Sequence, residues 1–256
     1  MAYILNDPTI FGLQLNVLDV YRLSIEIFEK DFLGVRWANA KDLVDKTYTK
    51  YAAQVGNLDC LIYLHENDCP WDERTCEAAA ANGHLYCLIY LHENGCPWND
   101  WTCYEAAANG HLDCLRYTHE NGCLWNEWTC KAAARNGHLD CLIYSHENGC
   151  PWDSRTCEAA ASNGHLDCLI YLHENGCPWD VRTCYWAAWN GYLDCLRYAH
   201  EQSCPWNEGT CAAAAACGHL DCLIYAHKNG CPYEDNICSS PYEHIKLYLQ
   251  QKGICP

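Results

Sequence analysis

The sequence predicts an all-α solenoid of helix-turn-helix repeats, and three observations carry that prediction. Cysteines recur in triplets that are offset by 27 residues, from Cys60, Cys69 and Cys76 to a last triplet that ends at Cys238. A fixed period of roughly 20–50 residues is typical of solenoids and arrays. Each unit also holds two stretches of helical length that end at Asn-Gly or a similar stop. Because helices this short are below the ~12–15 residues needed for stability in isolation, they must stack on neighbouring copies.

One unit, written from Asp72 to Trp98, reads DERTCEAAAANGHLYCLIYLHENGCPW. A short Asx side chain that accepts hydrogen bonds from free N–H groups is the expected cap of a helix. The unit therefore predicts one helix over 73–81, a left-handed Gly83 after it, and a second helix over 85–93. The seven units cover 45–233 and begin at Asp45, Asp72, Asn99, Asn126, Asp153, Asp180 and Asn207.

The segment at 80–95, AANGHLYCLIYLHENG, resembles the second half of an ankyrin repeat: the Ala-Ala pair, Gly-His, the Leu-rich second helix and the Asn-Gly stop follow in order. An ordinary ankyrin repeat has about 33 residues. When Gly83 is aligned, Cys76 stands where the family has the Leu of its TPLH motif. The missing residues then fall between Trp71 and Thr75, where the family has its β-hairpin finger. The chain is thus similar to the short GCPW type of repeat, abundant in giant viruses and single-celled eukaryotes. This resemblance implies an ankyrin-like solenoid that lacks β-hairpin fingers and binds proteins.

The 23 cysteines are predicted to be buried, reduced core side chains. Zinc sites favour close pairs such as C-x2-C, which do not occur here. Equivalent cysteines of adjacent repeats should lie ~8–10 Å apart, whereas a disulfide needs Cα atoms within about 7 Å. Only pairs across a turn, such as Cys69 and Cys76, stay geometrically open. We expect no metal, no cofactor and an intracellular, cytoplasmic protein, in the host cytoplasm if the chain is viral.

Two histidine registers and two aromatic registers are predicted to be structural. The first histidine register follows the inter-helix Gly and is expected to bond to backbone in that turn. The second lies near the end of the second helix and is expected to face its free carbonyls. Neither register forms a catalytic arrangement, so we predict no enzymatic activity, and the aromatic registers are expected to pack in the core or between repeats. The registers are His84, His111, His138, His165 and His219; His65, His92, His119, His146, His173, His200 and His227; Trp71, Trp98, Trp125, Trp152, Trp179 and Trp206; and the tyrosines from Tyr63 to Tyr225.

Positions that vary between units point to recognition. Variation concentrates at the third, sixth, seventh and tenth residues of the unit, which form one stripe of the first helix. The ankyrin resemblance implies that this helix faces the concave side. Trp, Tyr and Arg are enriched at binding hot spots, whereas unselected drift is the alternative explanation of the stripe. The predicted partner-binding residues are Arg74, Trp101, Tyr104, Trp128, Arg135, Arg155, Arg182, Tyr185, Trp186 and Trp189.

The two ends differ from the repeats. Residues 234–256 are a truncated capping repeat, in which Ser240-Pro241-Tyr242-Glu243 predicts a capping box and a helix beginning at Pro241. Residues 1–44 are expected to form a helical N-terminal cap. Within them, Ile10-Phe11 followed by LNVLDVYRLS is similar to part of an F-box, without its leading Leu-Pro. That similarity implies an alternative function, a substrate adaptor that recruits ubiquitin ligase machinery.

Composition narrows the function further. Sixteen Lys and Arg against 33 Asp and Glu give a formal net charge of −17, which argues against nucleic acid and against an anionic membrane as partners. No apolar run reaches the ~18 residues of a transmembrane helix. We therefore predict a non-enzymatic scaffold that binds a protein partner through the variable face of the first helices. The polar end helix argues against end-to-end polymerisation, so a monomer is expected.

Overall fold

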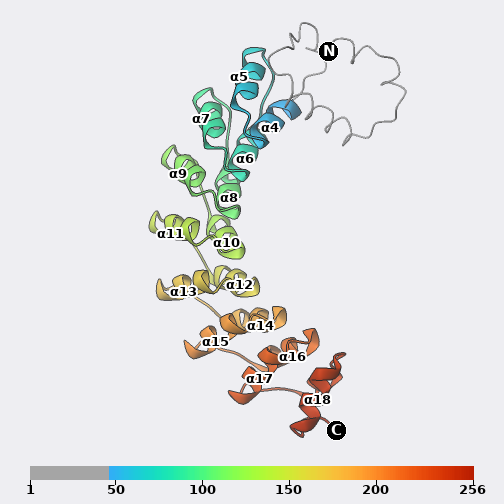
Figure 1. Cartoon of the computed structure of the whole chain (residues 1–256). Coiled ribbons are helices and arrows are strands. Elements are labelled where there is room, and N and C mark those ends of the chain that lie inside the picture. Colours follow the sequence, from blue (N-terminus) through green and yellow to red (C-terminus); the bar gives the residue numbers. More distant parts are fainter. Residues whose placement is uncertain (1–45) are drawn as a thin grey trace, which may run out of the picture.

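A computed structural model describes residues 46–256, which form a curved stack of helical hairpins (Figure 1). These described residues contain α-helices and one short 3-10 helix but no β-strand, so the predicted all-α solenoid without hairpin fingers is confirmed. The first helices of the hairpins are α4 (Lys46–Gln54), α6 (Glu73–Ala81), α8 (Asp100–Ala108), α10 (Glu127–Asn136), α12 (Ser154–Ser162), α14 (Val181–Asn190) and α16 (Glu208–Cys217). The second helices are α5 (Leu58–Glu66), α7 (Leu85–Glu93), α9 (Leu112–Glu120), α11 (Leu139–Glu147), α13 (Leu166–Glu174), α15 (Leu193–Glu201) and α17 (Leu220–Lys228).

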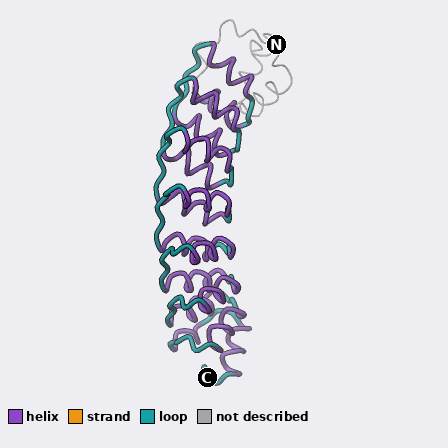
Figure 2. Tube along the Cα trace, turned by 90° about the vertical axis from the view of Figure 1, so that its left-hand side faces the viewer, coloured by secondary structure: helices purple, strands orange, loops and turns teal. Residues whose placement is uncertain are grey.

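The two helices of each hairpin form two layers of the solenoid. In Figure 1 the first helices, from α4 to α16, line the inner side of the arc, and the second helices fan apart on its outer side. The segments that lead from one hairpin to the next run along a single edge of the stack (Figure 2). The variable stripe of the first helices therefore belongs to the concave layer. We call these first helices the inner helices and the second helices the outer helices.

Each inner helix from α6 onward begins after the predicted Asx cap. The side chain of Asp72 accepts a hydrogen bond from the backbone N–H of Arg74 at 3.1 Å, and Thr75 completes a capping box. Such caps stabilise a helix by about 1 kcal/mol because they satisfy N–H groups that have no intrahelical partner. The prediction is confirmed at six units, whereas the seventh cap, Asp45, lies outside the described residues. The six caps are Asp72, Asn99, Asn126, Asp153, Asp180 and Asn207.

The turn inside each hairpin is built on a left-handed glycine that also touches the next repeat. Gly83 has a φ of +74°, and a Cβ atom added there would lie 2.6 Å from Nδ1 of His111. The first histidine register therefore packs on the glycine one repeat earlier, which the sequence did not reveal. The expected backbone bond is present at His84, whose Nε2 lies 3.1 Å from the carbonyl oxygen of Gln54. Here glycine is required by both backbone conformation and space.

A second contact between repeats joins the outer helices. The His92 ring stacks on Trp98 with centroids 3.9 Å apart, and its Nδ1 lies 3.0 Å from the hydroxyl of Tyr117 in the following repeat. The same His–Tyr hydrogen bond begins at His65, His92, His119, His146, His200 and His227. The predicted inter-repeat packing of Trp and Tyr is confirmed. The expectation that these histidines face helix carbonyls is wrong at these six, because Nδ1 of each ring lies within hydrogen-bonding distance of the tyrosine hydroxyl.

The core between the two layers is continuous along the array and is built from small and branched side chains. In one repeat, Cys76, Ala79 and Leu88 are fully buried, and the same positions are buried in the following repeats. Each internal repeat therefore packs against the repeat before it and the repeat after it, and no repeat encloses a core by itself.

The C-terminal cap departs from its predicted start. The 3-10 helix η1 (Asp235–Ser239) is followed by α18 (Glu243–Gln251), so the helix begins at Glu243 and not at Pro241. The predicted capping box is wrong: Tyr242 is the cap residue without a side-chain bond, and the Ser240 hydroxyl instead donates to the carbonyl oxygen of Ala215 at 2.7 Å. Ser240 is buried against the preceding repeat, and at the helix end its oxygen accepts a hydrogen bond from the backbone N–H of Tyr242 at 3.3 Å instead of capping Glu243. Ile245 and Leu249 are fully buried and cover the last face of the core.

The N-terminal assignments lie outside the described residues. These are the helical cap predicted for 1–44 and its F-box-like segment. In the part of the chain that the structure describes, no helix is both long and apolar enough to cross a membrane.

Candidate functional site

The ten predicted partner-binding residues all lie on the inner helices, between the start of α6 and the end of α14. Their exposure follows their place in the unit. Third and tenth positions are mostly exposed, with Trp101 at 55%, Trp128 at 47% and Trp189 at 38%, whereas sixth positions are half-buried. The structure brings seven of the ten residues into three clusters. The other three residues, Arg74, Arg135 and Arg182, form no cation–π contact with an aromatic ring of the described residues.

The first cluster is formed by Trp101 and Tyr104 on α8. Their rings meet edge to face, with centroids 5.0 Å apart and an interplanar angle of 68°. Such pairs contribute about 0.5–1.5 kcal/mol beyond the area they bury. This contact holds Trp101 in place while most of its indole remains in solvent.

The second cluster is centred on Trp128 of α10. The Lys131 ammonium lies 4.7 Å from the ring centroid, and the Arg155 guanidinium of the next inner helix lies 5.6 Å from it. Among the described residues, no ring contact joins Trp128 to Trp101 of the preceding inner helix. Sequence reasoning left Lys131 out of the partner-binding residues, although its position three residues after Trp128 was a usable signal.

The third cluster contains Tyr185, Trp186 and Trp189 on α14. Ring centroids are 5.1 Å apart between Tyr185 and Trp186, 5.8 Å between Tyr185 and Trp189, and 6.0 Å between the two tryptophans. On α16, the next inner helix, the corresponding positions hold Gly209 and alanines, and a Cβ added at Gly209 would lie 3.4 Å from the Tyr185 ring. The cluster therefore has no bulky neighbour on that side.

Trp186 differs from the other members because it stands at the seventh position. The equivalent alanines in other repeats, Ala132 and Ala213 among them, are buried. At the same position, burial raises the pKa of the Glu105 carboxyl, and the nearby Glu77 raises it further. The seventh position is thus partly removed from water, so Trp186 packs against its own scaffold more than the prediction assumed.

Two of the predicted arginines are paired within the protein. Arg155 forms an ion pair with Asp153 at 2.7 Å, and Arg182 forms one with Asp180 at 2.9 Å. The hydrogen bond from Arg155 holds the pKa of Asp153 below its ordinary value. Each carboxylate also caps its own helix. The charge of these arginines is therefore largely compensated before any partner arrives. Arg135 in the last turn of α10 is exposed.

Nearly all free thiols of residues 46–256 are buried, and only Cys69 and Cys217 are half-buried. Burial raises the pKa of Cys60 to about 12, so this thiol is neither a ready nucleophile nor a ready metal ligand at neutral pH. Within a repeat, the Cys130 thiol donates to the backbone carbonyl oxygen of Cys150 at 3.8 Å, a pair 20 residues apart that the sequence did not single out. Among residues 46–256, no group of three or more His, Cys, Asp or Glu side chains is placed to hold a metal ion.

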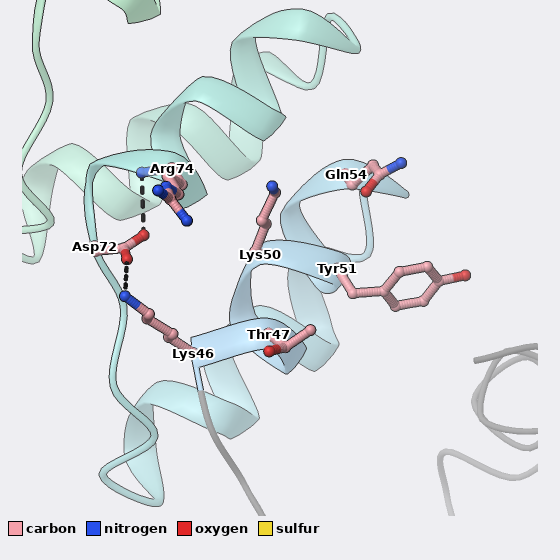
Figure 3. Close-up of a pocket in the computed structure, with 7 residues that line it drawn as sticks. All are labelled: Lys46, Thr47, Lys50, Tyr51, Gln54, Asp72 and Arg74. Atoms are coloured by element: carbon pink, nitrogen blue, oxygen red, sulfur yellow. Dashed lines mark hydrogen bonds and ion pairs between the residues drawn. The ribbon is translucent and has the colours of Figure 1, made fainter. Parts of the chain in front are cut away.

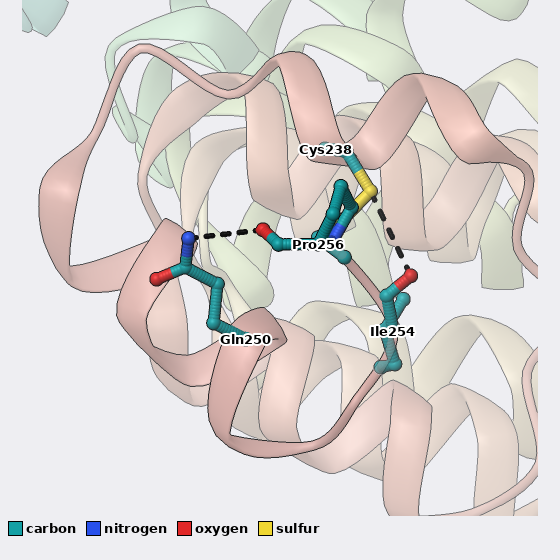
Figure 4. The surroundings of a disulfide bond; sticks show 5 residues. Cys238, Gln250, Ile254 and Pro256 are labelled. Atoms are coloured by element: carbon teal, nitrogen blue, oxygen red, sulfur yellow. Dashed lines mark hydrogen bonds between the residues drawn. A yellow bond between two sulfur atoms is a disulfide. The ribbon is translucent and has the colours of Figure 1, made fainter.

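One pair departs from the predicted free thiols. Cys238 and Cys255 form a disulfide across the C-terminal cap, 17 residues apart, with Cα atoms 5.7 Å apart (Figure 4). Cys238 takes the place that Cys76 holds in a full repeat. The place of Cys96 is held by Ile254, whose backbone N–H donates to the carbonyl oxygen of Leu249 as that of Cys96 donates to Leu91. The prediction that no cysteine is bridged is therefore corrected at this position, because the shortened cap brings the chain end back onto η1.

Comparison with known proteins agrees with this architecture. The family model described as ankyrin repeats (many copies) matches residues 103–144 and 157–200. Among solved structures, the crystal structure of the human ASB11 ankyrin repeat domain is similar, with a TM-score of 0.53 and 18% sequence identity. That match covers 61% of this chain and 84% of the other, and at this identity it concerns the fold alone. No curated protein sequence matches the chain significantly.

Proposed function

Because this chain is an ankyrin-repeat protein, we propose that it is a non-enzymatic scaffold that binds a protein partner on the concave face of its array. The binding residues are the variable residues of the inner helices, and the three aromatic clusters are the anchors. Ankyrin repeats are generally protein-binding modules, so the class of function follows from the family. The choice of face and residues is the part that we propose.

The observation that carries this proposal is the exposure of large aromatic side chains where the fold does not need them. Trp101 and Trp128 are about half exposed, and the same position holds Arg74 and Gly209 in other repeats of the same array. Exposed tryptophans that do not support packing leave apolar surface in water, which is unfavourable unless another surface covers it. Buried aromatic anchors of this kind typically contribute ≥ ~2 kcal/mol to binding.

The test is partner capture by the immobilised full chain and by three variants. Trp101→Ala with Trp128→Ala, and separately Trp189→Ala, should weaken capture of the same protein by about tenfold or more. Tyr86→Ala is the matched control, because Tyr86 is 76% exposed but lies on the outer helix α7. Capture that survives both inner variants, or that is lost only with Tyr86→Ala, would place the binding face elsewhere.

A second candidate, a substrate adaptor for ubiquitin ligase machinery, depends on the F-box-like segment of 1–44. The same capture experiment separates the two functions when it is repeated on a chain that begins at residue 45. An adaptor would lose ligase components and keep its other partner, whereas a simple scaffold would show the same set of proteins. A concave-face partner lost together with 1–44 would count against both candidates.

A further inference from the structure

A cavity of about 230 Å³ opens at the N-terminal end of the described array, between α4 and α6 (Figure 3). One wall comes from α4, and the other comes from Asp72 and Arg74 at the start of α6. A water molecule takes about 30 Å³ of liquid volume, and pockets for drug-sized ligands run from about 300 Å³ upward. The cavity is therefore the right size for one polar side chain or one small ion and too small for a nucleotide.

The charges around this cavity are not balanced. Lys46 is paired with Asp72 at 2.7 Å, while Lys50 and Arg74 form no ion pair with any residue of 46–256. Figure 3 shows the Lys50 and Arg74 side chains extending toward the same space. Two neighbouring cations that lack a counter-charge repel each other. This arrangement stands in a chain whose net charge is −17.

Comparison with the other repeats explains why Arg74 has no ion pair within residues 46–256. Arg155 and Arg182 occupy the same position of their units, and each pairs with the aspartate that caps its own helix. The equivalent aspartate for Arg74 is Asp72, but its second oxygen is taken by Lys46 while its first accepts from the helix backbone. Between α4 and α6, the Arg74 guanidinium therefore lacks the carboxylate partner that Arg155 and Arg182 have in later repeats.

We propose that this cavity binds an oxyanion group of the protein partner, a carboxylate or a phosphate. The assignment rests on the proposed function, because Arg74 directly precedes Trp101 and Trp128 in the row of third positions. Hydrogen bonds between Arg or Lys and an oxyanion are charge-assisted and about twice as strong as neutral ones. Adjacent inner helices lie about 10 Å apart, so the acidic group of the partner sits about that far from its contact with Trp101.

The test uses small anions and needs no partner. Inorganic phosphate and, separately, acetate are titrated into the full chain at low ionic strength, while the side-chain N–H resonances of Arg74 and Lys50 are followed by NMR. Low salt matters because screening weakens exposed charges. We expect a saturable shift of both resonances. A shift with phosphate but not with acetate would indicate that the partner supplies a phosphate group. A shift with both anions would indicate that a carboxylate of the partner is sufficient for binding.

Two double variants decide the assignment. Lys50→Met with Arg74→Met should weaken anion binding by about tenfold or more without lowering the melting temperature, because it removes two like charges. Arg116→Met with Arg197→Met removes the same charge from outer helices and should leave anion binding unchanged. The proposal is overturned if neither anion gives a saturable shift, or if both double variants respond alike. Since no partner takes part, failure of this test is distinct from failure of the concave-face proposal.

Discussion

At the scale of single residues, identical side chains have different roles according to what surrounds them. Trp98 stacks on His92 and meets Tyr117 of the next repeat, whereas Trp101, only three residues later, is 55% exposed. The first helps to hold two repeats together, whereas the ring contact of the second is with Tyr104 on its own helix. The glycines show the same contrast. Gly83 is covered by His111, while Gly95 has no neighbour within 4 Å of where its Cβ would be.

The glycine contrast gives a prediction about stability. Gly83→Ala should destabilise the protein by about 1–3 kcal/mol more than Gly95→Ala, because only Gly83 adds a steric conflict to the strain of its positive φ. Gly95→Ala should cost about 1–2 kcal/mol for that strain alone. The chain already holds Asp68 and Ser203 at the Gly95 position with positive φ.

Urea unfolding of the two variants measures the difference. Equal losses of unfolding free energy would show that His111 moves away at little cost, and the contact between the turns would then not hold the repeats in place.

At the scale of elements, helix boundaries could be predicted from sequence and contacts between repeats could not. The spans 73–81 and 85–93 match α6 and α7 because caps and stops are local signals. The hydrogen bond between His92 and Tyr117 joins residues 25 apart, a spacing that belongs to the stack and to no single helix. The shortened cap keeps the contact at a different spacing, since Tyr248 lies 21 residues after His227 and bonds to it.

The candidate site divides in the same way. The position of the stripe on the inner helices followed from helical spacing, and so did the contact of Trp101 with Tyr104. The pairing of Arg155 with Asp153 was missed, because whether a cation is free depends on rotamers and neighbouring repeats. The Lys46–Asp72 ion pair that releases Arg74 crosses from one repeat to the next, and composition gave no sign of it.

The cap yields a prediction about the thiols. When the protein is denatured without reductant, every cysteine except Cys238 and Cys255 should react with a thiol reagent. The native protein should contain no zinc. Closing a loop of this length stabilises a protein by about 3 kcal/mol. Cys238→Ser with Cys255→Ser should therefore lower the melting temperature under oxidising conditions and make no difference under reducing ones. Two additional thiols in the wild-type titration would show that this pair is reduced like the other pairs, and stoichiometric zinc would contradict the buried-core account.

At the scale of the whole molecule, the residues that hold the repeats together differ from the residues that we propose to bind a partner. The outer helices α5, α9, α11, α13, α15 and α17 each carry an aspartate in their first turn. Cations such as Arg74, Lys131 and Arg135 lie on the inner helices together with the aromatic clusters. Much of the negative charge thus faces outward, and an acidic partner is repelled from the convex side.

A modular array predicts that whole units can be removed. Deletion of 126–152 takes out α10 and α11 together and joins Trp125 to Asp153, a junction like those already present. That variant should remain helical and melt close to the wild type, because stability in such arrays is roughly a sum of repeat and interface terms. Deletion of 126–138 leaves α11 without its inner helix and should melt much lower. Far-UV circular dichroism and thermal melts compare the two, and equal damage would mean that the hairpin pair is not the structural module.

The central claim is that different residues stabilise the array and bind the partner. It is tested most directly by measuring both partner capture and melting temperature for two variants. Trp98→Ala should lower the melting temperature by several degrees, since truncating a packed tryptophan costs about 3 kcal/mol or more. Below its melting temperature it should still capture the partner. Trp101→Ala with Trp128→Ala should melt like the wild type and lose capture by about tenfold or more. If this double variant instead loses stability as Trp98→Ala does while it retains full capture, the exposed tryptophans are packing residues and the concave face is not the binding surface.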